Sequence, residues 1–378
     1  MKIVFLCGSL EPGRDGVGDY VRSLITEMLI QGCKTAAIAL NDKHIIEEKS
    51  NELLPSFNGS HLYRLPSAWS DVKRFKRAKQ LIDELDPTWL SLQFVPFSFH
   101  VRGLSFDLHK RLYHLGKGRS WHLMMHELWV GMDYDSPLKL VLWGKVQKCL
   151  IKALIKQLKP IVLHTQTPLY QAQLTDLGFC SQLLPLFSNI PNLNSYSNTH
   201  NLEDSPHLLR IKRDISLIVF GSIHPGAPIN EFADDAAKYA KNYGVNVTLT
   251  TIGRCGPEEK RWARIWAEKG LIISSLGEQH PSCISEILLK ATIGVVTTPA
   301  ALIGKSGTAA AMHEHGLPVL CVTRPWIARG VKGPEVPSGV LTYHPGNFAV
   351  YLNDNKLPLV NSVFNVVQQL VRALSSAI

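Results

Sequence analysis

The feature that most constrains the fold is a recurring order of a short apolar run, a glycine- or proline-containing loop and an amphipathic segment. The runs are mainly apolar, and the first of them is continuous, which is typical of strands that are buried on both faces of a parallel sheet. They are Ile3–Cys7, Thr35–Leu40, Trp89–Phe94, His122–Met125, Ile161–His164, Leu183–Leu186, Ile215–Phe220, Asn246–Ile252, Ile272–Leu276, Ile293–Thr297 and Val319–Val322. The intervening segments have the spacing of helices, including 78–86, 103–115, 168–177, 229–242, 257–269 and 282–290. The order predicts an α/β protein in which helices connect the strands of parallel sheets.

A change of composition divides the chain of 378 residues into two parts. Residues 189–206 are rich in Asn, Ser, Pro and His and show little periodicity, and the strand pattern begins again at Ile215. We therefore predict an N-terminal doubly wound domain over 1–188, a linker over 189–210 and a C-terminal domain of the same architecture over 211–360. Residues 361–378 predict an amphipathic helix that packs back onto the N-terminal domain.

The net charge of +9 and the pI of about 9.1 favour anionic partners such as nucleotides, nucleic acid or acidic lipid headgroups. Over residues 139–159, five lysines recur at intervals of three and four: Lys145, Lys148, Lys152, Lys156 and Lys159. Apolar residues are expected on another face of this helix: Leu142, Val146, Leu150, Leu154 and Leu158. Such a helix either lies on an anionic membrane surface or is a domain helix with solvated lysines. Nucleic acid is not expected as a partner, because the basic clusters lack interleaved aromatic residues and a recognisable binding motif.

The expected cellular compartment is inferred from the absence of a membrane-spanning run, a secretory signal and paired cysteines in the sequence. No apolar run reaches the roughly 20 residues that span a bilayer, and the first run is too short for a secretory signal. The seven cysteines are scattered without a C-x-x-C pair, as in proteins of reducing compartments. We expect a cytoplasmic protein, with peripheral attachment to the inner face of the membrane as the further option. A zinc site is not expected, because the cysteines are scattered, and no cofactor is expected either.

The most informative loop follows the apolar run Ile293–Thr297. Small residues and hydroxyls, Gly304, Ser306, Gly307 and Thr308, surround Lys305, and an alanine-rich helix that Gly316 and Pro318 terminate begins at Thr308. Free backbone N–H groups, the positive end of a helix dipole and a lysine together form a site for a diphosphate. The alternative is an ordinary strand-to-helix connection with a surface lysine, since Pro299 stands where a P-loop has its first glycine.

Two loops of the N-terminal domain also follow strands at the edge where open α/β sheets bind ligands. Gly16-x-Gly18 precedes a helix, but the carboxylate of Asp19 is a poor neighbour for a phosphate, so this loop more plausibly faces a sugar or an acceptor. His126 comes directly after His122–Met125 and is followed by Glu127, which suits proton-transfer chemistry. A loop histidine bonded to backbone explains the same pattern.

These segments resemble the retaining nucleotide-sugar glycosyltransferases of the GT-B fold, in particular glycosyltransferase family four. The resemblance covers nearly the whole chain, through the order of elements more than through any invariant string. In the N-terminal half, Asp15–Val21 matches the family's first glycine loop, and His126 stands where the family has a functional histidine. In the C-terminal half, the matching segments are Phe220-Gly221, Leu249–Gly256, Leu276-Gly277 and the Gly-x-Pro-Val at Gly316–Val319.

The resemblance implies two Rossmann-like doubly wound domains facing each other across a cleft, with the nucleotide-sugar donor on the C-terminal domain. His126 is the implied catalytic residue. The donor diphosphate is expected at Lys305, Ser306, Gly307, Thr308 and Arg254, the acceptor or sugar loop at Gly16, Gly18 and Asp19, and the base or ribose at Gly277, Glu278 and Glu314.

The sequence departs from the family pattern at two places. The family's ribose-holding glutamate falls on Ala311 or His313, depending on the direction of counting, and Glu314 is in neither register. The arginine and lysine that usually follow the first C-domain strand are also missing from the loop at 222–226. Ribose recognition is therefore left without a residue.

The implied activity moves a sugar from a nucleoside-diphosphate sugar to an acceptor hydroxyl, with retention of configuration and without a metal. The acceptor class stays open between a glycan, a lipid-linked sugar and a small molecule. Two alternatives remain: a sugar-nucleotide epimerase of the same fold, and a non-catalytic glycosyltransferase-like binding protein, which the missing glutamate and basic pair would suit. A dehydrogenase is disfavoured because no full Gly-x-Gly-x-x-Gly follows a strand.

Overall fold

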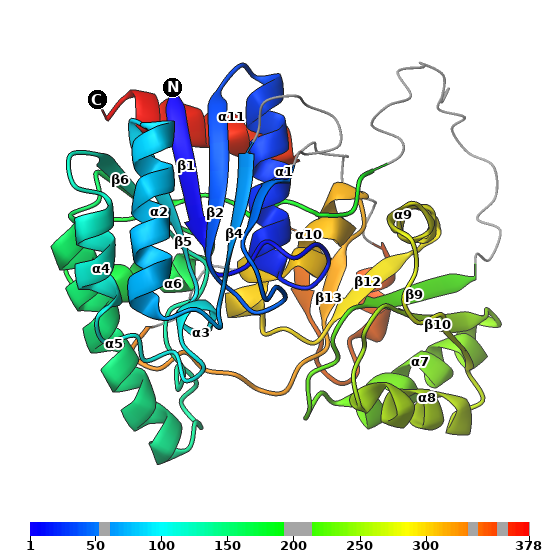
Figure 1. The fold of residues 1–378 in the computed structure, drawn as a ribbon. Coiled ribbons are helices and arrows are strands. Elements are labelled where there is room, and N and C mark those ends of the chain that lie inside the picture. Colours follow the sequence, from blue (N-terminus) through cyan, green and yellow to red (C-terminus); the bar gives the residue numbers. More distant parts are fainter. Residues whose placement is uncertain (53–60, 193–213, 332–338, 354–361, 378) are drawn as a thin grey trace. The chain divides into compact units, whose positions relative to one another are not determined.

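The computed structural model describes residues 1–52, 61–192, 214–331, 339–353 and 362–377 (Figure 1). Within them the chain forms two compact units. Unit 1 comprises Met1–Pro185, Ile327–Pro334 and Val363–Ile378, and unit 2 comprises Leu186–Trp326 and Glu335–Ser362. Most of the predicted linker, 193–210, lies outside the described residues, so the linker stays a prediction.

Unit 1 is built on an eight-stranded sheet in the order β3-β4-β2-β1-β5-β6-β7-β8, in which β3 alone pairs antiparallel. Its strands are β1 (Lys2–Cys7), β2 (Lys34–Asp42), β3 (Lys49–Glu52), β4 (His61–Pro66), β5 (Trp89–Phe94), β6 (Ser120–Met125), β7 (Val162–Thr165) and β8 (Gln182–Leu183). Its helices are α1 (Gly16–Ile30), α2 (Asp71–Leu85), α3 (Pro96–Phe99), α4 (Leu108–Leu115), α5 (Leu138–Leu158), α6 (Pro168–Asp176) and α11 (Ser362–Ser375). No helix in the described part of the chain is long and apolar enough to cross a membrane.

Unit 2 has a six-stranded, all-parallel sheet in the order β11-β10-β9-β12-β13-β14. Its strands are β9 (Ile215–Phe220), β10 (Val247–Ile252), β11 (Ile272–Ser275), β12 (Ile293–Val296), β13 (Val319–Cys321) and β14 (Val340–Thr342). Its helices are α7 (Ile229–Tyr243), α8 (Glu258–Glu268), α9 (Pro281–Lys290) and α10 (Gly307–Glu314), with the 3₁₀ segments η2 (Ala300–Lys305) and η3 (Phe348–Asn353).

Both sheets reverse their winding direction beside their first strand. In unit 1, β1 lies between β2 and β5, and in unit 2, β9 lies between β10 and β12. The loops that leave two such neighbouring strands diverge to opposite faces of the sheet and open a crevice between them, which is where open α/β sheets bind ligands. The predicted α/β class and the parallel sheets are therefore confirmed.

Three sequence expectations need correction. The helix expected over 103–115 begins only at Leu108, because Gly103 has a φ of +63° and 101–107 are turns and loop. The helix expected over 78–86 begins earlier, at Asp71, where the Ser70 side chain caps its N-terminus. The strands β3, β4 and β14 were not predicted from the sequence, since they are short or contain polar residues.

The terminal helix α11 belongs to unit 1, as does the short segment Ile327–Pro334. The buried residues of α11 are Val366, Val367, Leu370 and Leu374. Gln369 Nε2 donates to the carbonyl of Leu183, 2.7 Å away, at the end of β8. Its apolar stripe thus covers part of unit 1.

Candidate functional site

A pocket of about 590 Å³ lies in unit 2 at the carboxyl ends of its central strands. It is bordered by the loops that follow β9, β12 and β13, and so it occupies the crevice at the switch point of the sheet. The lining residues are His224, Pro225, Ala227, Thr297, Thr298, Pro299, Leu302, Lys305, Ser306, Thr323, Arg324 and Trp326. Most of the polar members are cations or hydroxyls.

Thr297 holds two of these loops in place. Its hydroxyl accepts the N–H of His224 at 2.8 Å and donates to the carbonyl of Ser222 at 3.4 Å, which ties the loop after β12 to the loop after β9. Gly221 is the turn residue that allows this approach: its φ is +80°, and a Cβ there would lie 2.8 Å from Cγ2 of Thr308. The start of α10 therefore packs against the end of β9.

The N-terminus of α10 carries the predicted small-residue turn, which the structure refines. Lys305 ends the 3₁₀ segment η2, and Ser306 then caps α10 by accepting the N–H of Ala309 at 3.3 Å. The N–H groups of Gly307 and Thr308 have no acceptor among the described residues. Two unsatisfied donors at the positive end of a helix dipole suit an anion.

The electrostatics of the pocket favour negative ligands. Lys305 and Arg324 come from different elements, η2 and the loop after β13, and both line the same pocket. Burial, followed by the nearby Lys305, lowers the pKa of His224, so this imidazole is neutral at physiological pH and offers hydrogen bonds rather than charge. Two cations, hydroxyls and open N–H groups together can neutralise a diphosphate.

The structure brings together some of the residues expected at the donor and separates others. Lys305 and Ser306 line the pocket, and Gly307 and Thr308 follow directly. Arg254 is not among the described residues that line it; its Nε lies 3.1 Å from a carboxylate oxygen of Glu278, in an exposed ion pair.

The residues expected near the base or ribose lie outside the pocket lining. The carbonyl of Gly277 accepts the N–H of Gly253 at 2.7 Å. The Glu314 carboxylate accepts the N–H of Ser188, while its carbonyl accepts from Asn192 at 2.6 Å. In this geometry Glu314 anchors the segment that enters unit 2.

Sequence reasoning missed Arg324 and Trp326, and it quoted His224 only as part of a loop. Each follows a strand of the same sheet, so a search for polar residues after every strand would have found them. Gly226, with a φ of +83°, lies next to Arg324, and a Cβ there would come within 3.3 Å of the arginine's Cδ. Arg324 supplies a cation to this crevice from the loop after β13.

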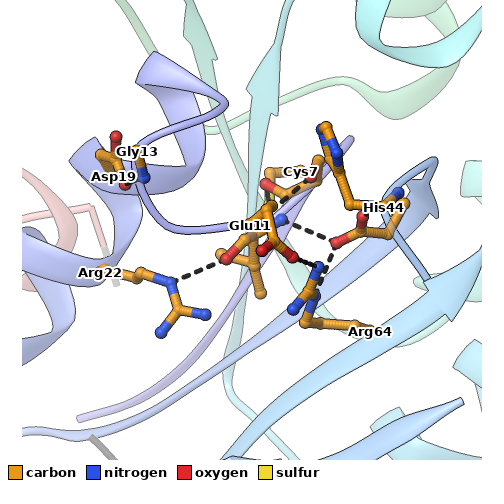
Figure 2. A network of polar contacts seen from close by, with 10 residues as sticks. Cys7, Glu11, Gly13, Asp19, Arg22, His44 and Arg64 are labelled. Carbon is orange, nitrogen blue, oxygen red and sulfur yellow. Dashed lines mark hydrogen bonds and ion pairs between the residues drawn. The ribbon is translucent and has the colours of Figure 1, made fainter. Parts of the chain in front are cut away.

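In unit 1 the backbone of the glycine loop is hydrogen-bonded by the loop's own side chains, and Figure 2 shows Asp19 beside Gly13. Asp15 accepts the N–H groups of Val17 and Gly18 at 3.0 and 2.9 Å, and Asp19 accepts that of Gly13 at 3.0 Å. Gly18 is required here, because a Cβ would lie 2.6 Å from the carbonyl oxygen of Ser9. The loop is thus closed by internal hydrogen bonds.

A network of charged side chains, Asp42, Arg64 and Glu11, contacts the same loop. Asp42 accepts from Arg64 Nε at 2.7 Å and from the N–H of Leu10 at 3.1 Å, and Figure 2 shows Arg64 also reaching Glu11. Burial alone would raise the pKa of Asp42, but these hydrogen bonds and the Arg64 charge leave it below its usual value. Arg22 Nε donates to the carbonyl of Leu10 at 2.8 Å, which holds the loop against α1.

His126 lies beside this loop but inside the unit, with 5% of its surface exposed. Its ring packs edge-on against the ring of Tyr20, with 5.0 Å between the ring centroids. Tyr20 directly follows Asp19 in the chain. Its Nε2 is 2.8 Å from Oε1 of Gln93, which can only accept. Burial lowers the pKa of His126 to about 4, although a hydrogen bond with Gln166 partly offsets this. His126 is therefore neutral, with Nε2 protonated.

A chain of buried side chains continues from Gln93 across three strands. Gln93 Nε2 donates to Ser91 Oγ at 2.8 Å, Ser91 Oγ lies 2.7 Å from His122 Nδ1, and His122 Nε2 lies 3.0 Å from His164 Nδ1. Donor and acceptor roles alternate consistently along this chain when both histidines are neutral. Burial lowers the pKa of both, to about 4 for His164. The described residues contain no group of three or more His, Cys, Asp or Glu placed to hold a metal ion.

Comparison with known proteins shows similarity at the level of structure. No protein-family model matches the sequence, and no curated protein sequence matches it. HepE of Anabaena, in complex with UDP and glucose, is 13% identical with a TM-score of 0.57 over 100% of both chains. The catalytic domain of starch synthase IV from Arabidopsis thaliana, bound to ADP and acarbose, is 11% identical with a TM-score of 0.55 over 100% of this chain and 99% of that one.

A third similar structure belongs to a Listeria monocytogenes protein assigned as a UDP-N-acetylglucosamine 2-epimerase. It is 10% identical, with a TM-score of 0.50 over 99% of this chain and 88% of that one. At such identities the similarity defines the fold, and the chain has the GT-B fold of two Rossmann-like units.

Proposed function

We propose that this protein is a glycosyltransferase that moves a sugar from a nucleoside-diphosphate sugar to an acceptor hydroxyl. The observation that carries the proposal is the pocket of unit 2, where Lys305 and Arg324 face a crevice next to two open N–H groups of α10. Similar folds in HepE and starch synthase IV hold UDP and ADP. A nucleoside diphosphate has the charge and hydrogen-bonding capacity that this pocket requires.

In the proposed reaction, the bond between the anomeric carbon and the diphosphate oxygen breaks while a bond to the acceptor oxygen forms. Negative charge builds on the departing diphosphate, and groups fixed around that position lower the barrier. Lys305, Arg324 and the N–H groups of Gly307 and Thr308 have this role in our proposal. The neutral His224 adds a hydrogen bond, and the indole of Trp326 offers an apolar face to the base or sugar.

Retention of configuration and independence from metal ions belong to the same proposal. Two side-chain cations in the pocket supply the charge that a divalent ion would otherwise provide. We expect EDTA to leave turnover unchanged, and the anomeric coupling constant of the product, measured by NMR, to match that of the donor. An inverted product or a loss of activity with EDTA would contradict these parts while leaving nucleotide binding intact.

In unit 1 we propose that Gly16, Gly18 and Asp19 face the sugar or acceptor and that His126 acts there as a neutral hydrogen-bonding group. Its depressed pKa argues against a role as general base near neutral pH. Unchanged kcat and KM in His126→Ala, with normal folding, would remove His126 from the site. The acceptor class stays open between a glycan, a lipid-linked sugar and a small molecule.

The primary test is a thermal-shift panel of UDP, ADP, GDP and their sugar conjugates. A ligand at about 100 times its Kd stabilises its protein by roughly 2.7 kcal/mol, which is easily measured. Lys305→Ala and Arg324→Ala should each weaken binding about tenfold or more, since charge-assisted hydrogen bonds contribute roughly 1.5–3 kcal/mol. Lys290→Ala is the matched control, because Lys290 is an exposed lysine of α9 outside the pocket lining.

Incubation with the donor, first alone and then with a panel of acceptors, separates the alternatives. Slow donor hydrolysis, or transfer to any added acceptor, supports the transferase; an epimerised free donor supports the epimerase that the Listeria structure brings into consideration. Tight nucleotide binding without turnover on a broad acceptor panel would support the non-catalytic binding protein. Wild-type nucleotide binding by Lys305→Ala and Arg324→Ala would reject the pocket assignment itself.

A further inference from the structure

The surface around α5 differs from what its sequence spacing suggests. The buried residues of α5 are Gly144, Gln147, Ile151, Leu154, Ile155 and Leu158. Leu142 and Val146, expected on one apolar face together with Leu154 and Leu158, are 52% and 41% exposed, and Leu138 is 72% exposed. Exposed apolar residues in the first half of the helix thus share one side with exposed lysines, namely Lys145, Lys152, Lys156 and the C-cap residue Lys159.

Two further segments extend this surface. The loop 97–106 is fixed to α5, since Trp143 Nε1 donates to the carbonyl of Arg102 at 2.9 Å and Phe97 lies 6.4 Å from the Trp143 ring. This loop exposes Val101 and Phe106, at 86% and 60%. Helix α4 packs on α5 beside it, as the neighbouring ribbons in Figure 1 show. It exposes Lys110 and Tyr113, and Lys117 is exposed in the turn that follows it. We call the exposed side chains of α4, α5 and 97–106 the α4–α5 face.

The charge of the α4–α5 face has one sign. The sequence contains no Asp or Glu from Ser136 to Thr175, and 87–126 contains Asp107 alone, which pairs with Lys110 at 3.4 Å. Lysines by themselves would suit any polyanion. Large apolar side chains interspersed with them would gain nothing from phosphates, but they would gain from insertion into the acyl boundary below lipid headgroups.

We propose that the α4–α5 face binds an anionic lipid bilayer, with α5 lying in the plane of the headgroups. The exposed lysines contact acidic headgroups, and Leu138, Leu142, Val146, Val101 and Phe106 insert toward the acyl chains. The occupant follows from charge complementarity combined with apolar exposure on the same two helices and their neighbouring loop. The proposal does not depend on the donor pocket, because it concerns unit 1 only.

The test is flotation of the purified protein with vesicles of phosphatidylcholine alone and with one third phosphatidylglycerol. Binding is expected only to the anionic vesicles, and it should weaken as salt rises. Lys152→Glu, Lys156→Glu and Lys159→Glu combined should lower the partition coefficient by roughly a hundredfold or more, since each lysine contributes about fivefold. Equal binding to both vesicle types, or unchanged binding of this variant, would overturn the proposal.

Two further variants separate this surface from the overall charge and from nucleic acid. Lys241→Glu, Lys260→Glu and Lys290→Glu combined make the same charge change at exposed positions of unit 2, and this variant should keep most of its binding. Leu138→Ser with Leu142→Ser should lower vesicle binding about tenfold, in proportion to the apolar area lost, and leave binding of a short single-stranded RNA unchanged.

Equal loss in the unit 2 control would reduce the effect to net charge and overturn the proposal. Unaltered vesicle binding of the leucine variant, with RNA bound more tightly than vesicles, would assign the face to a nucleic acid instead. Each variant is first shown to have the wild-type melting temperature and the wild-type thermal shift with nucleotide. Failure of the lipid proposal therefore stays distinct from failure of the donor pocket.

Discussion

The connection from β1 to α1 in unit 1 and the connection from β12 to α10 in unit 2 join the same kinds of element at the same edge of similar sheets. Both contain glycines and a polar N-cap residue. In unit 1 the cap is Asp15, whose carboxylate takes two backbone N–H groups. In unit 2 the cap is Ser306, which takes only that of Ala309 and leaves those of Gly307 and Thr308 without an acceptor.

This difference extends to the surroundings of each turn. The unit 1 turn rests on the closed network of Asp42, Arg64 and Glu11, and beside it lies the neutral His126. The unit 2 turn borders an open pocket with Lys305 and Arg324. A carboxylate cap neutralises a helix N-terminus from within, whereas a hydroxyl cap leaves part of the dipole to be satisfied by a ligand. The two turns are thus similar in composition, but the turn of unit 2 is suited to bind an anion and the turn of unit 1 is not.

The largest expected effect comes from giving unit 2 the cap of unit 1. Ser306→Asp preserves a good N-cap but places a carboxylate where the diphosphate is proposed to bind. Nucleotide affinity should fall by roughly a hundredfold or more, since like charges ~4 Å apart near a surface repel by about 4 kcal/mol. Isothermal titration with UDP or the best nucleotide of the panel measures this. Ser306→Asn is the matched control, because it caps equally well without charge; similar affinity losses in both variants would contradict the electrostatic comparison.

The second prediction concerns the neutral interior of unit 1. His126 has a folded-state pKa of about 4 against 6.5 for the free side chain, so between these values the unfolded chain binds more protons. The neutral His126 therefore contributes about 3 kcal/mol to the free energy of unfolding above about pH 6.5, and this contribution is lost as the pH falls toward 4. Hydrogen exchange of β6, corrected for intrinsic rates and compared between about pH 7 and pH 5, should show this loss.

His126→Gln is the control for that pH dependence, since it keeps a hydrogen-bonding side chain without a titratable ring. Its β6 protection should depend less steeply on pH than that of the wild type. An identical slope in both proteins would mean that the acid sensitivity arises elsewhere, for instance from His122 and His164, whose pKa values burial also lowers.

The sequence predicted the strands with continuous apolar runs well, because burial on both faces leaves an unmistakable pattern. It missed β4, whose buried Arg64 reads as polar until its partners Asp42 and Glu11 are known. It also grouped Leu142 and Val146 with the buried Leu154 and Leu158 on one face of α5, since periodicity shows that a helix has two faces but not which residues the domain covers.

The candidate site was predictable only where it is local in the chain. Lys305–Thr308 is one short segment, and its turn, cap and helix start follow from residue chemistry. Arg324 and His224 come from other loops, which only the sheet order brings to the same crevice. Glu314 was expected near the base or ribose because it lies close to the position of the family's ribose-binding glutamate. In the structure its carboxylate instead accepts the N–H of Ser188, which is far away in the sequence.

The smallest expected effect tests the closure of the unit 1 turn by packing rather than charge. In Gly18→Ala the new Cβ would lie 2.6 Å from the Ser9 carbonyl oxygen, and because this oxygen belongs to the backbone the turn must shift. We expect a loss of roughly 1–3 kcal/mol, typical of overpacking, measured by denaturant unfolding. Gly16→Ala is the control in the same loop, since nothing lies within 4 Å of its Cβ position, and Gly307→Ala in unit 2 is open in the same way. If all three variants were equally stable, the unit 1 turn would have room to relax, and its closure would depend on the Asp15 and Asp19 hydrogen bonds alone.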